Sequence, residues 1–355
     1  MAAPRNPRRS TGDQALDQAI AQLLSAVAVT TKDSDGRLDN RDQVRDILTT
    51  AVQMAMDASE GRADRLDLKI ASTTLLEMRD AYRLLGAYRG TRKVTIFGSA
   101  RTAPDDPLYQ QTKAVAAAMA AKGWMVVTGA GPGIMAAGLD GAGRENALGV
   151  AIRLPFESEA NEYVDADRLI DMRYFFTRKL ALIRESDGFI VMPGGFGTLD
   201  EAFEVLTLVQ TGKATPVPMV MLGLGHGYWT AWQQFVEKVI EEGYISSTDR
   251  QLYKVTNDVD DAVGEICGFY SNYRSIRWVN DVLVIRMQHG PTDAQLAEIS
   301  TRFGEFADAD GVWRTGPLPQ EVSGKDNLEL ARIALRFSRR QPGRLRGLID
   351  AVNAW

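Results

Sequence analysis

The sequence predicts an α/β protein built around a Rossmann-like, doubly wound parallel sheet. Between residues 93 and 222, five apolar segments of strand length alternate with segments of helical periodicity. Strands that are apolar on both faces are typical of a parallel sheet that helices cover on both sides. Glycine-rich turns follow several of these strands, as expected where a doubly wound sheet binds a ligand. An N-terminal helical segment and a small C-terminal α+β appendage flank the sheet.

The individual elements follow from hydrophobic period and breaker residues. Residues 1–12 are expected to be disordered, and the segment up to residue 90 is predicted to contain helices only, at 13–28, 41–59 and 63–88. The predicted strands of the sheet are 93–97, 124–128, 148–154, 188–192 and 217–222, and its helices are 108–121, 133–143, 174–185, 198–210 and 227–241. After Tyr273 the pattern predicts a strand at 279–287, a helix at 293–306, a mixed or strand-like segment at 328–337 and a helix at 341–352. The predicted domains are therefore 1–90, 91–270 and 271–355.

Composition restricts the class of protein. The chain has 355 residues, of which 45% are hydrophobic and 25% charged, as in ordinary globular proteins. A net charge of -5 argues against a nucleic-acid-binding face over the whole molecule, so an anion site has to be built locally. No apolar run approaches the roughly 18 residues of a membrane span. A lone cysteine, Cys267, fits a reducing compartment, and we expect a cytoplasmic protein without membrane or nucleic-acid partners.

The segment Pro193–Glu201, with the sequence PGGFGTLDE, is the most informative part of the chain. Gly194, Gly195 and Gly197 let the backbone turn tightly after a strand and approach an anion, while the first amides of the following helix stay free to bind it. We therefore predict a phosphate cradle here. Thr198 is expected to be the N-cap of the helix or a hydroxyl ligand.

Glu201 lies about one helical turn beyond the cradle. A carboxylate beside a phosphate raises the cost of binding, so Glu201 is interpreted as a chemical group rather than as part of an anion site. Glu204 shares its helix face and is expected to face solvent, and Asp200 is expected to be a capping or surface charge.

Two further glycine-rich turns follow strands that should end at the same edge of the sheet. The first contains Gly98 and Ser99, and the second contains Gly129, Gly131 and Gly133. Neither has the dinucleotide fingerprint or a Walker motif, which leaves binding of a mononucleotide phosphate. A fourth loop, 222–227, is interpreted as a flexible surface loop.

PGGFGTLDE, together with the upstream pair Arg178–Lys179 and the turn Phe97–Arg101, resembles the signature of the LOG family. These proteins are phosphoribohydrolases of cytokinin nucleotides and related nucleoside monophosphates. The resemblance covers about residues 93 to 270 and implies that Arg178 and Glu201 are catalytic. It also implies at least a homodimer with active sites near the subunit interface. Lys179 is taken as substrate-binding, with plain surface charge as the alternative.

One residue departs from the family pattern. Phe176 stands two residues before Arg178, where the family often has histidine, so an acid–base candidate is missing and Tyr174 is a partial substitute. The prediction is therefore hydrolysis of nucleoside 5'-monophosphates in general, with AMP-like or cytokinin riboside monophosphates as substrates. The alternative is a non-catalytic protein of the same fold that binds or carries a nucleotide or phosphorylated cofactor.

No metal or cofactor is expected. The two histidines, His226 and His289, are far apart and lack ligand spacing. Neither precedes a lysine, as a Schiff-base lysine motif of a pyridoxal phosphate decarboxylase would require, so a decarboxylase is excluded.

Overall fold

The computed structural model describes residues 10–27, 30–33, 36–153, 161–225, 227–304, 307–325, 327–337 and 342–355. The chain forms two compact units. The first consists of residues 1–76 and 317–329, and the second of residues 77–316 and 330–355. The finer division into three domains, with boundaries near residues 90 and 270, stays a prediction.

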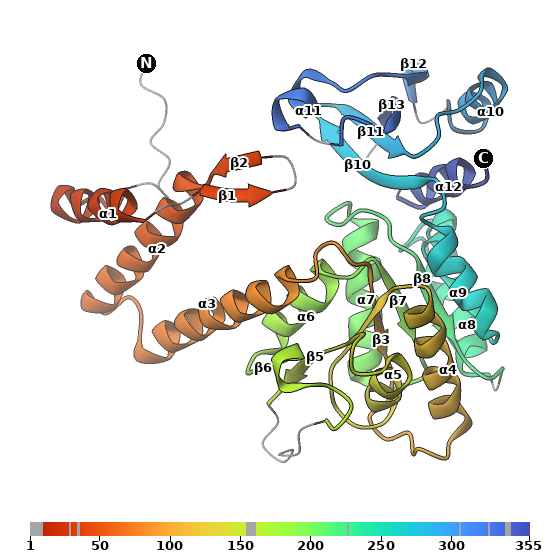
Figure 1. Ribbon diagram of the computed structural model, residues 1–355, viewed down its shortest axis with the longest axis horizontal. Helices are drawn as coiled ribbons and strands as arrows, with labels where there is room; N and C mark the ends of the chain where they lie inside the picture. Colours follow the sequence, from red (N-terminus) through yellow and green to blue (C-terminus); the bar gives the residue numbers. More distant parts are fainter. Residues whose placement is uncertain are drawn as a thin grey trace. The chain divides into compact units, whose positions relative to one another are not determined.

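The second unit contains a seven-stranded, wholly parallel sheet (Figure 1). Its strand order is β6-β5-β4-β3-β7-β8-β9. The strands are β3 (Lys93–Phe97), β4 (Met125–Thr128), β5 (Ala147–Ile152), β6 (Leu169–Met172), β7 (Gly188–Val191), β8 (Met219–Leu222) and β9 (Lys254–Thr256). Five of them were predicted. β6 and β9 were missed because they have only four and three residues and carry charged side chains, Asp171 and Lys254.

Helices cover both faces of this sheet, which confirms the doubly wound α/β class (Figure 1). One face packs against α4 (Pro107–Ala121), α5 (Ile134–Ala142) and α9 (Val259–Gly268). The other packs against α6 (Phe175–Arg184), α7 (Phe196–Gln210), α8 (Tyr228–Glu241) and the end of α3 (Arg65–Gly86). Two short 3-10 helices, Ala166–Arg168 and Ser247–Leu252, complete the connections.

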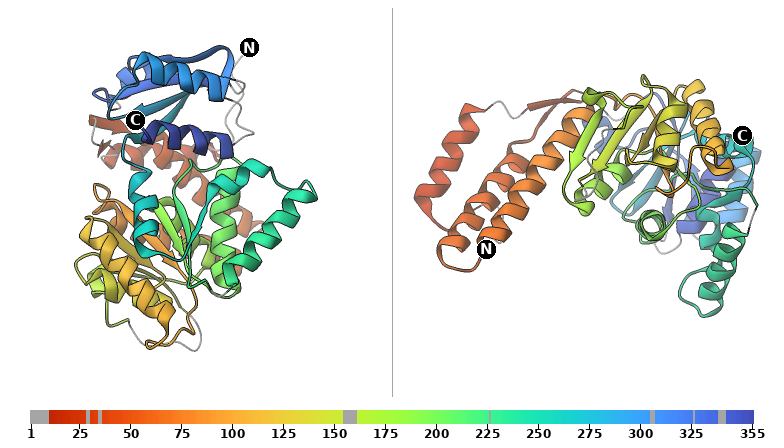
Figure 2. Two further views of the ribbon diagram at one scale, coloured as in Figure 1. Left: turned by 90° about the vertical axis from the view of Figure 1, so that its right-hand side faces the viewer. Right: turned by 90° about the horizontal axis from the view of Figure 1, so that it is seen from below.

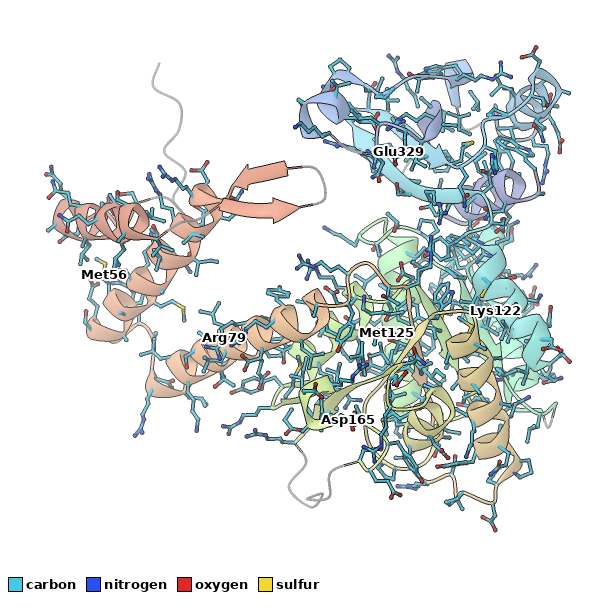
Figure 3. All side chains as sticks on the ribbon, in the orientation of Figure 1. Met56, Arg79, Lys122, Met125, Asp165 and Glu329 are labelled. Atoms are coloured by element: carbon cyan, nitrogen blue, oxygen red, sulfur yellow. The ribbon has the colours of Figure 1, made fainter. Side chains whose placement is uncertain are left out.

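β4 shows why the strands are apolar on both faces. Met125, labelled in Figure 3, and Val127 pack with the α6–α7–α8 layer, whereas Val126 packs with the α4–α5–α9 layer. All three side chains are buried. Because successive residues of a strand point to opposite faces, a strand between two helical layers needs an uninterrupted apolar run.

The order of the strands fixes where a ligand can bind. From β3 the chain builds β4, β5 and β6 on one side, and it then returns to add β7, β8 and β9 on the other side of β3. The switch point lies between β3 and β7, and ligands of open α/β sheets bind outside the carboxyl ends of the strands at such a point. The turns that begin at Gly98 and Pro193 leave this pair of strands.

The C-terminal part of the second unit is an antiparallel sheet of order β10-β11-β13-β12, with helices packed on it (Figure 2). Its elements are β10 (Tyr273–Val279), β11 (Val282–Met287), α10 (Asp293–Phe303), β12 (Ala307–Arg314), β13 (Ala331–Phe337) and α12 (Pro342–Asn353). The single strand predicted at 279–287 is wrong in extent: the chain turns at Asn280, which has a φ of 57°, and β10 and β11 form a hairpin.

The first unit contains α1 (Gln14–Ala26), β1 (Thr30–Asp33), β2 (Gly36–Asp39), α2 (Arg41–Ser59), the first part of α3, and α11 (Pro319–Gly324). The expectation of helices only is wrong, because β1 and β2 form an antiparallel hairpin. Each strand has four residues and a largely polar sequence, so no alternating pattern marked it. Disorder was expected for residues 1–12, of which 1–9 lie outside the described residues. For residues 10–12 the expectation is wrong, because Thr11 is buried and its N–H and hydroxyl both donate to the Asp17 carboxylate at 2.8 Å. No helix in the described ranges has the length and hydropathy needed to cross a membrane.

Candidate active site

A cavity of about 1650 Å³ opens at the carboxyl edge of the parallel sheet. It exceeds the common size of small-molecule pockets, about 300–1,000 Å³, so a mononucleotide fits with room to spare. Ten of the predicted site residues line it: Gly98, Ser99, Gly129, Gly131, Arg178, Gly194, Gly195, Gly197, Thr198 and Glu201. Gly133 and Lys179 do not line it.

Backbone hydrogen bonds join the three glycine-rich turns. The N–H of Ser99 donates to the carbonyl of Pro193 at 3.3 Å, and the N–H of Ile134 donates to the carbonyl of Ser99 at 3.0 Å. Gly133 makes the second bond possible: its φ is 67°, and a Cβ atom there would lie 2.4 Å from the Ser99 carbonyl oxygen. A Cβ at Gly98 would likewise collide with Ile134, at 2.4 Å. Both glycines therefore allow close packing of the turns.

The amino end of α7 faces the cavity with bare main chain. Gly195 is the N-cap and has no side chain to cap the helix, and the first turn contains no acidic residue. The first amides of a helix have no intrahelical acceptor, and the helix dipole makes this end positive. A Cβ atom at Gly195 or Gly197 would have no atom within 4 Å, so both positions border open space. This end of α7 can bind an anion.

Thr198 is not the N-cap, because the helix begins two residues earlier, at Phe196. Its side chain is buried, and its hydroxyl oxygen would lie 2.2 Å from a Cβ atom at Gly194. The first two glycines of the motif thus differ: Gly194 leaves room for the Thr198 hydroxyl, whereas Gly195 leaves room at the cavity. The hydroxyl-ligand interpretation of Thr198 stays a prediction.

Glu201 is buried in the wall of the cavity, with 6% of its surface exposed. Burial raises the pKa of its carboxyl group to about 7, against the opposing charges of Lys179 and Arg178. Among the described residues, Oε2 has no hydrogen-bond donor, and its nearest cation, the Lys179 ammonium, is 4.0 Å away. A carboxyl group with a pKa near neutrality and a free oxygen is suited to general acid–base chemistry.

Lys179 lies among three carboxylates of α7 instead of in the cavity. Its ammonium is 2.7 Å from Asp200, 2.8 Å from Glu204 and 4.0 Å from Glu201. Burial lowers the pKa of Lys179, but hydrogen bonds to Asp200 and Glu204 outweigh it, so the net pKa is raised and the ammonium stays charged. Asp200 and Glu204 therefore do not merely face solvent, as expected, but hold the cation beside Glu201.

Arg178 comes from α6 and reaches the turn after β4. A Cβ atom at Gly129 would lie 2.3 Å from the guanidinium nitrogen Nη2, so the glycine is needed for Arg178 to occupy this place. The guanidinium lies 5.9 Å from the Phe175 ring centroid, and its charge lowers the pKa of Glu201. Arg178 and Glu201, 23 positions apart in sequence, thus belong to one electrostatic site.

The buried face of α6 is not the face that carries its large apolar side chains. Thr177, Ala181 and Leu182 are buried, whereas Phe175, Phe176 and Leu180 are about half exposed. The apolar pattern of this short helix therefore marked an exposed face. Phe176 stacks on Tyr174, with ring centroids 5.5 Å apart.

Two residues with a role at the cavity were missed. Tyr228, which follows the loop 222–227, lines the cavity and donates its hydroxyl hydrogen to the carbonyl of Gly194 at 2.6 Å. Gly223 of this loop is buried and donates its N–H to the carbonyl of Thr256 at 3.1 Å, so the loop is held against β9 at its start, and the interpretation as a flexible surface loop is wrong for Gly223. His226 lies outside the described residues. Glu77 on α3 accepts hydrogen bonds from the start of α6.

The far end of the cavity lies at β5 and β6. The register of these strands pairs Ala151 with Asp171 and Gly149 with Leu169. Ala151, Leu169 and Asp171 line the cavity, and they share one face of the sheet because paired and alternate residues point the same way. This end is a small apolar shelf with a carboxylate at its border.

Within the residues that the structure describes, no three His, Cys, Asp or Glu side chains are grouped as metal ligands would be.

The fold and the site define a Rossmann-like α/β protein with a binding cavity at the switch point of its sheet. Residues 119–266 match the protein family described as "Possible lysine decarboxylase". Cytokinin riboside 5'-monophosphate phosphoribohydrolase from Mycobacterium marinum is 30% identical over 165 residues, which cover 45% of this chain and 87% of that protein. The enzyme of the same name from Mycobacterium tuberculosis is 32% identical over 160 residues, 44% of this chain and 83% of that protein. The chain belongs to this family, the LOG family.

Other similarities are shorter or more distant. LOG4 of Arabidopsis thaliana, a cytokinin riboside 5'-monophosphate phosphoribohydrolase, is 43% identical over 75 residues, but these are only 21% of this chain and 34% of the plant protein. Among solved structures, the molybdenum cofactor carrier protein of Chlamydomonas reinhardtii has a TM-score of 0.36 at 22% identity, covering 49% of this chain and 94% of that chain.

Proposed function

We propose that the protein hydrolyses the N-glycosidic bond of nucleoside 5'-monophosphates, giving the free base and ribose 5-phosphate. The observation that carries the proposal is the position of Glu201: a buried carboxyl group, with a pKa of about 7, in the wall of the cavity that the amino end of α7 also borders. Membership in the LOG family and the names of the mycobacterial relatives support the same reaction class.

The 5'-phosphate binds at the start of α7. The open space at Gly195 and Gly197 leaves the first amides of the helix accessible, and the positive helix end favours a dianion. The hydroxyl group of Thr198 is a further hydrogen-bond donor to the phosphate. Binding the phosphate here holds the ribose over the cavity wall, so the glycosidic bond is fixed without any contact specific to the base.

The reaction replaces the C1'–N bond by a C1'–O bond to water. The Glu201 carboxylate accepts a proton from the attacking water and stabilises the positive charge that develops on the sugar. The bonding electrons leave with the base, which takes up a proton from solvent at its nitrogen, and Glu201 then releases its proton to solvent. Arg178 holds phosphate or sugar oxygens through its planar guanidinium.

The base lies on the shelf of β5 and β6. Ala151 and Leu169 offer an apolar surface to a flat ring, and Asp171 offers acceptor oxygens to its N–H groups. Asp171→Asn should therefore change the relative kcat/KM for bases with and without amino groups at this edge by several-fold, roughly 1–2 kcal/mol. Equal losses for all bases would place the base elsewhere.

We also propose that the protein acts in the cytoplasm as a homodimer or larger homo-oligomer. Three half-exposed apolar side chains of α6, those of Phe175, Phe176 and Leu180, support a subunit contact next to Arg178. Light scattering on the purified protein tests this, and a monomer at micromolar concentration would contradict it.

A substrate panel tests the reaction itself. Purified protein is incubated with AMP, GMP, CMP, UMP and isopentenyladenine riboside 5'-monophosphate, and free base and ribose 5-phosphate are quantified by chromatography, with the corresponding nucleosides as controls that lack the phosphate. We expect equimolar base and ribose 5-phosphate from at least one nucleotide and little from its nucleoside. Tight nucleotide binding without release of base would instead support a carrier or sensor protein.

A further inference from the structure

Glu77 is a buried carboxylate that no sequence motif indicated. It lies on α3, outside the segment 119–266 that matches the family, and it is 7% exposed. Its two oxygens accept separate hydrogen bonds: Oε1 from the backbone N–H of Arg173 at 2.6 Å and Oε2 from the hydroxyl of Thr177 at 2.6 Å. Both donors belong to the entry into α6. A carboxylate is expensive to bury, and two short charge-assisted bonds are the compensation.

α6 needs such a partner because its own sequence provides none. The N-cap position is Tyr174, which makes no side-chain cap, and the first turn contains no acidic residue. The first amides of a helix and its positive end require an acceptor, and a negative charge is the most favourable one. Glu77, from a different helix, supplies the negative charge at this end, and it accepts from the N–H of Arg173, just before the helix, and from the Thr177 hydroxyl of the first turn.

Thr177, which donates to Glu77, lies next to the two cations of the site in the sequence. Thr177 is 1% exposed, so its hydroxyl bond fixes α6 in rotation as well as in position. Arg178 and Lys179 follow directly in the sequence. Arg178 reaches the cavity beside Gly129, and Lys179 reaches Glu201. A turn or shift of α6 would displace both cations from Glu201 at once.

We propose that Glu77 is the positioning residue of the site: it anchors the start of α6 and thereby holds Arg178 and Lys179 at Glu201. The inference rests on the proposed function for its effect on turnover, but not for its effect on geometry. It makes the end of α3, which precedes the matched segment, a necessary part of the site.

The first test does not depend on catalysis. Four charged groups face the Glu201 carboxyl: Lys179 and Arg178 lower its pKa, and Glu204 and Asp200 raise it. The Glu201 pKa is measured by carbon-13 NMR of carboxyl-labelled protein, with Glu201→Gln to assign the signal. In Glu77→Gln, which removes the negative charge at the start of α6 and turns one of the two acceptor atoms into a donor, we expect an upward shift of at least about 0.5 unit because the two cations move away. An unchanged pKa would overturn the proposal.

The matched control is Asp80→Asn, which removes a carboxylate from the same helix. Asp80 is about half exposed and pairs with its neighbour Arg79, so the Glu201 pKa should not change. If Glu77→Gln does not fold, Thr177→Val tests the same bond from the other side. It keeps the shape of Thr177 and removes one donor, so we expect a smaller shift in the same direction, and no shift would again count against the proposal.

Turnover gives the second test, through a double-mutant cycle with Arg178→Ala. If nucleotides are hydrolysed, Glu77→Gln should lower kcat by roughly 10- to 100-fold, as misplacement by about 1 Å does, with a smaller change in KM. In the Arg178→Ala background the further loss should be below about three-fold. Equal losses in both backgrounds would show that Glu77 does not act through Arg178. Absence of hydrolysis by the wild-type protein would instead reject the proposed function, and the NMR result would still decide the role of Glu77.

Discussion

The two main glycine-rich turns, 129–133 and 194–197, look alike in sequence but use their glycines differently. After β4, each glycine leaves room for the protein itself: Gly129 for the Arg178 guanidinium, Gly131 for the Met135 side chain, and Gly133 for the Ser99 carbonyl. After β7, Gly194 makes room for Thr198, but Gly195 and Gly197 border open space.

This difference separates two functions of glycine that a motif cannot distinguish. A glycine whose missing Cβ would meet protein atoms is required for packing, whatever the ligand. A glycine that borders the cavity is not required for packing. Its missing side chain instead lets a ligand in the cavity approach the backbone closely. This difference supports the proposal that phosphate binds at the turn before α7, whereas the turn after β4 makes room for Arg178.

The largest expected effect is on stability, at Gly133. Gly133→Ala would place a Cβ atom 2.4 Å from the Ser99 carbonyl oxygen in a backbone with φ of 67°, so the backbone itself would have to move. We expect the free energy of unfolding to fall by roughly 2–4 kcal/mol, measured by denaturant titration. A loss below 1 kcal/mol would show that this turn is not held as tightly as described.

At Gly129 the expected effect is on activity. The atoms in the way of a Cβ are the ends of flexible side chains, Arg178 Nη2 at 2.3 Å and Met135 Sδ at 2.7 Å. Gly129→Ala should therefore displace Arg178 at little cost in stability and lower kcat/KM by about 10- to 100-fold, as steady-state kinetics with the best nucleotide would show. Normal kinetics would separate Arg178 from the reaction.

The pH dependence tests whether Glu201 acts as a carboxylate. Because burial raises its pKa to about 7 in the ligand-free protein, the reactive form is lost as the pH falls, and kcat/KM should decrease about tenfold per pH unit below that value. A rate that stays constant between about pH 5 and about pH 8 would contradict a general-base role for Glu201.

The raised pKa of Glu201 should affect the stability of the fold in the direction opposite to its effect on activity. The folded pKa lies above the ordinary value of 4.5, so the fold disfavours the carboxylate, and stability should fall as the pH rises from about 4.5 to about 7. Above about pH 7 this effect should lower the free energy of unfolding by an amount on the order of 3 kcal/mol. Glu201→Gln should remove this part of the pH dependence, which thermal unfolding across the range would show.

The smallest expected effect is at Gly197. Gly197→Ala adds a methyl group in open space within a helix, so stability should rise by about 0.5–1 kcal/mol. The same methyl group narrows the approach to the first amides of α7, and KM for the nucleotide should rise several-fold, roughly 1 kcal/mol, with kcat little changed. An unchanged KM would remove this turn from phosphate binding.

Much of the fold could be predicted because it depends on local signals. The doubly wound sheet follows from uninterrupted apolar strands such as 125–128, and the tight turn into α7 follows from the glycines between a strand and an amphipathic helix. The hairpin β1–β2 and strand β6 could not be predicted, because each strand has only four residues and owes its conformation to pairing with another strand.

The site was predictable only as a list of residues. Arg178 and Lys179 are neighbours in sequence, yet one lines the cavity and the other lies among three carboxylates of α7, a difference set by the packing of α6 against α7. Tyr228 is connected to the site by one hydrogen bond and Glu77 by two, all between segments distant in sequence, and such bonds leave no periodic or compositional trace.

The most direct test of the account is the turnover of Glu201→Gln compared with its nucleotide binding. The amide keeps the shape of the buried side chain but cannot accept a proton from water, and it leaves the phosphate site at α7 intact. We expect kcat to fall by at least about 100-fold while the dissociation constant, measured by calorimetry, changes by less than about threefold. Retained turnover in this variant would contradict the central claim that the buried acid of α7 performs the hydrolysis.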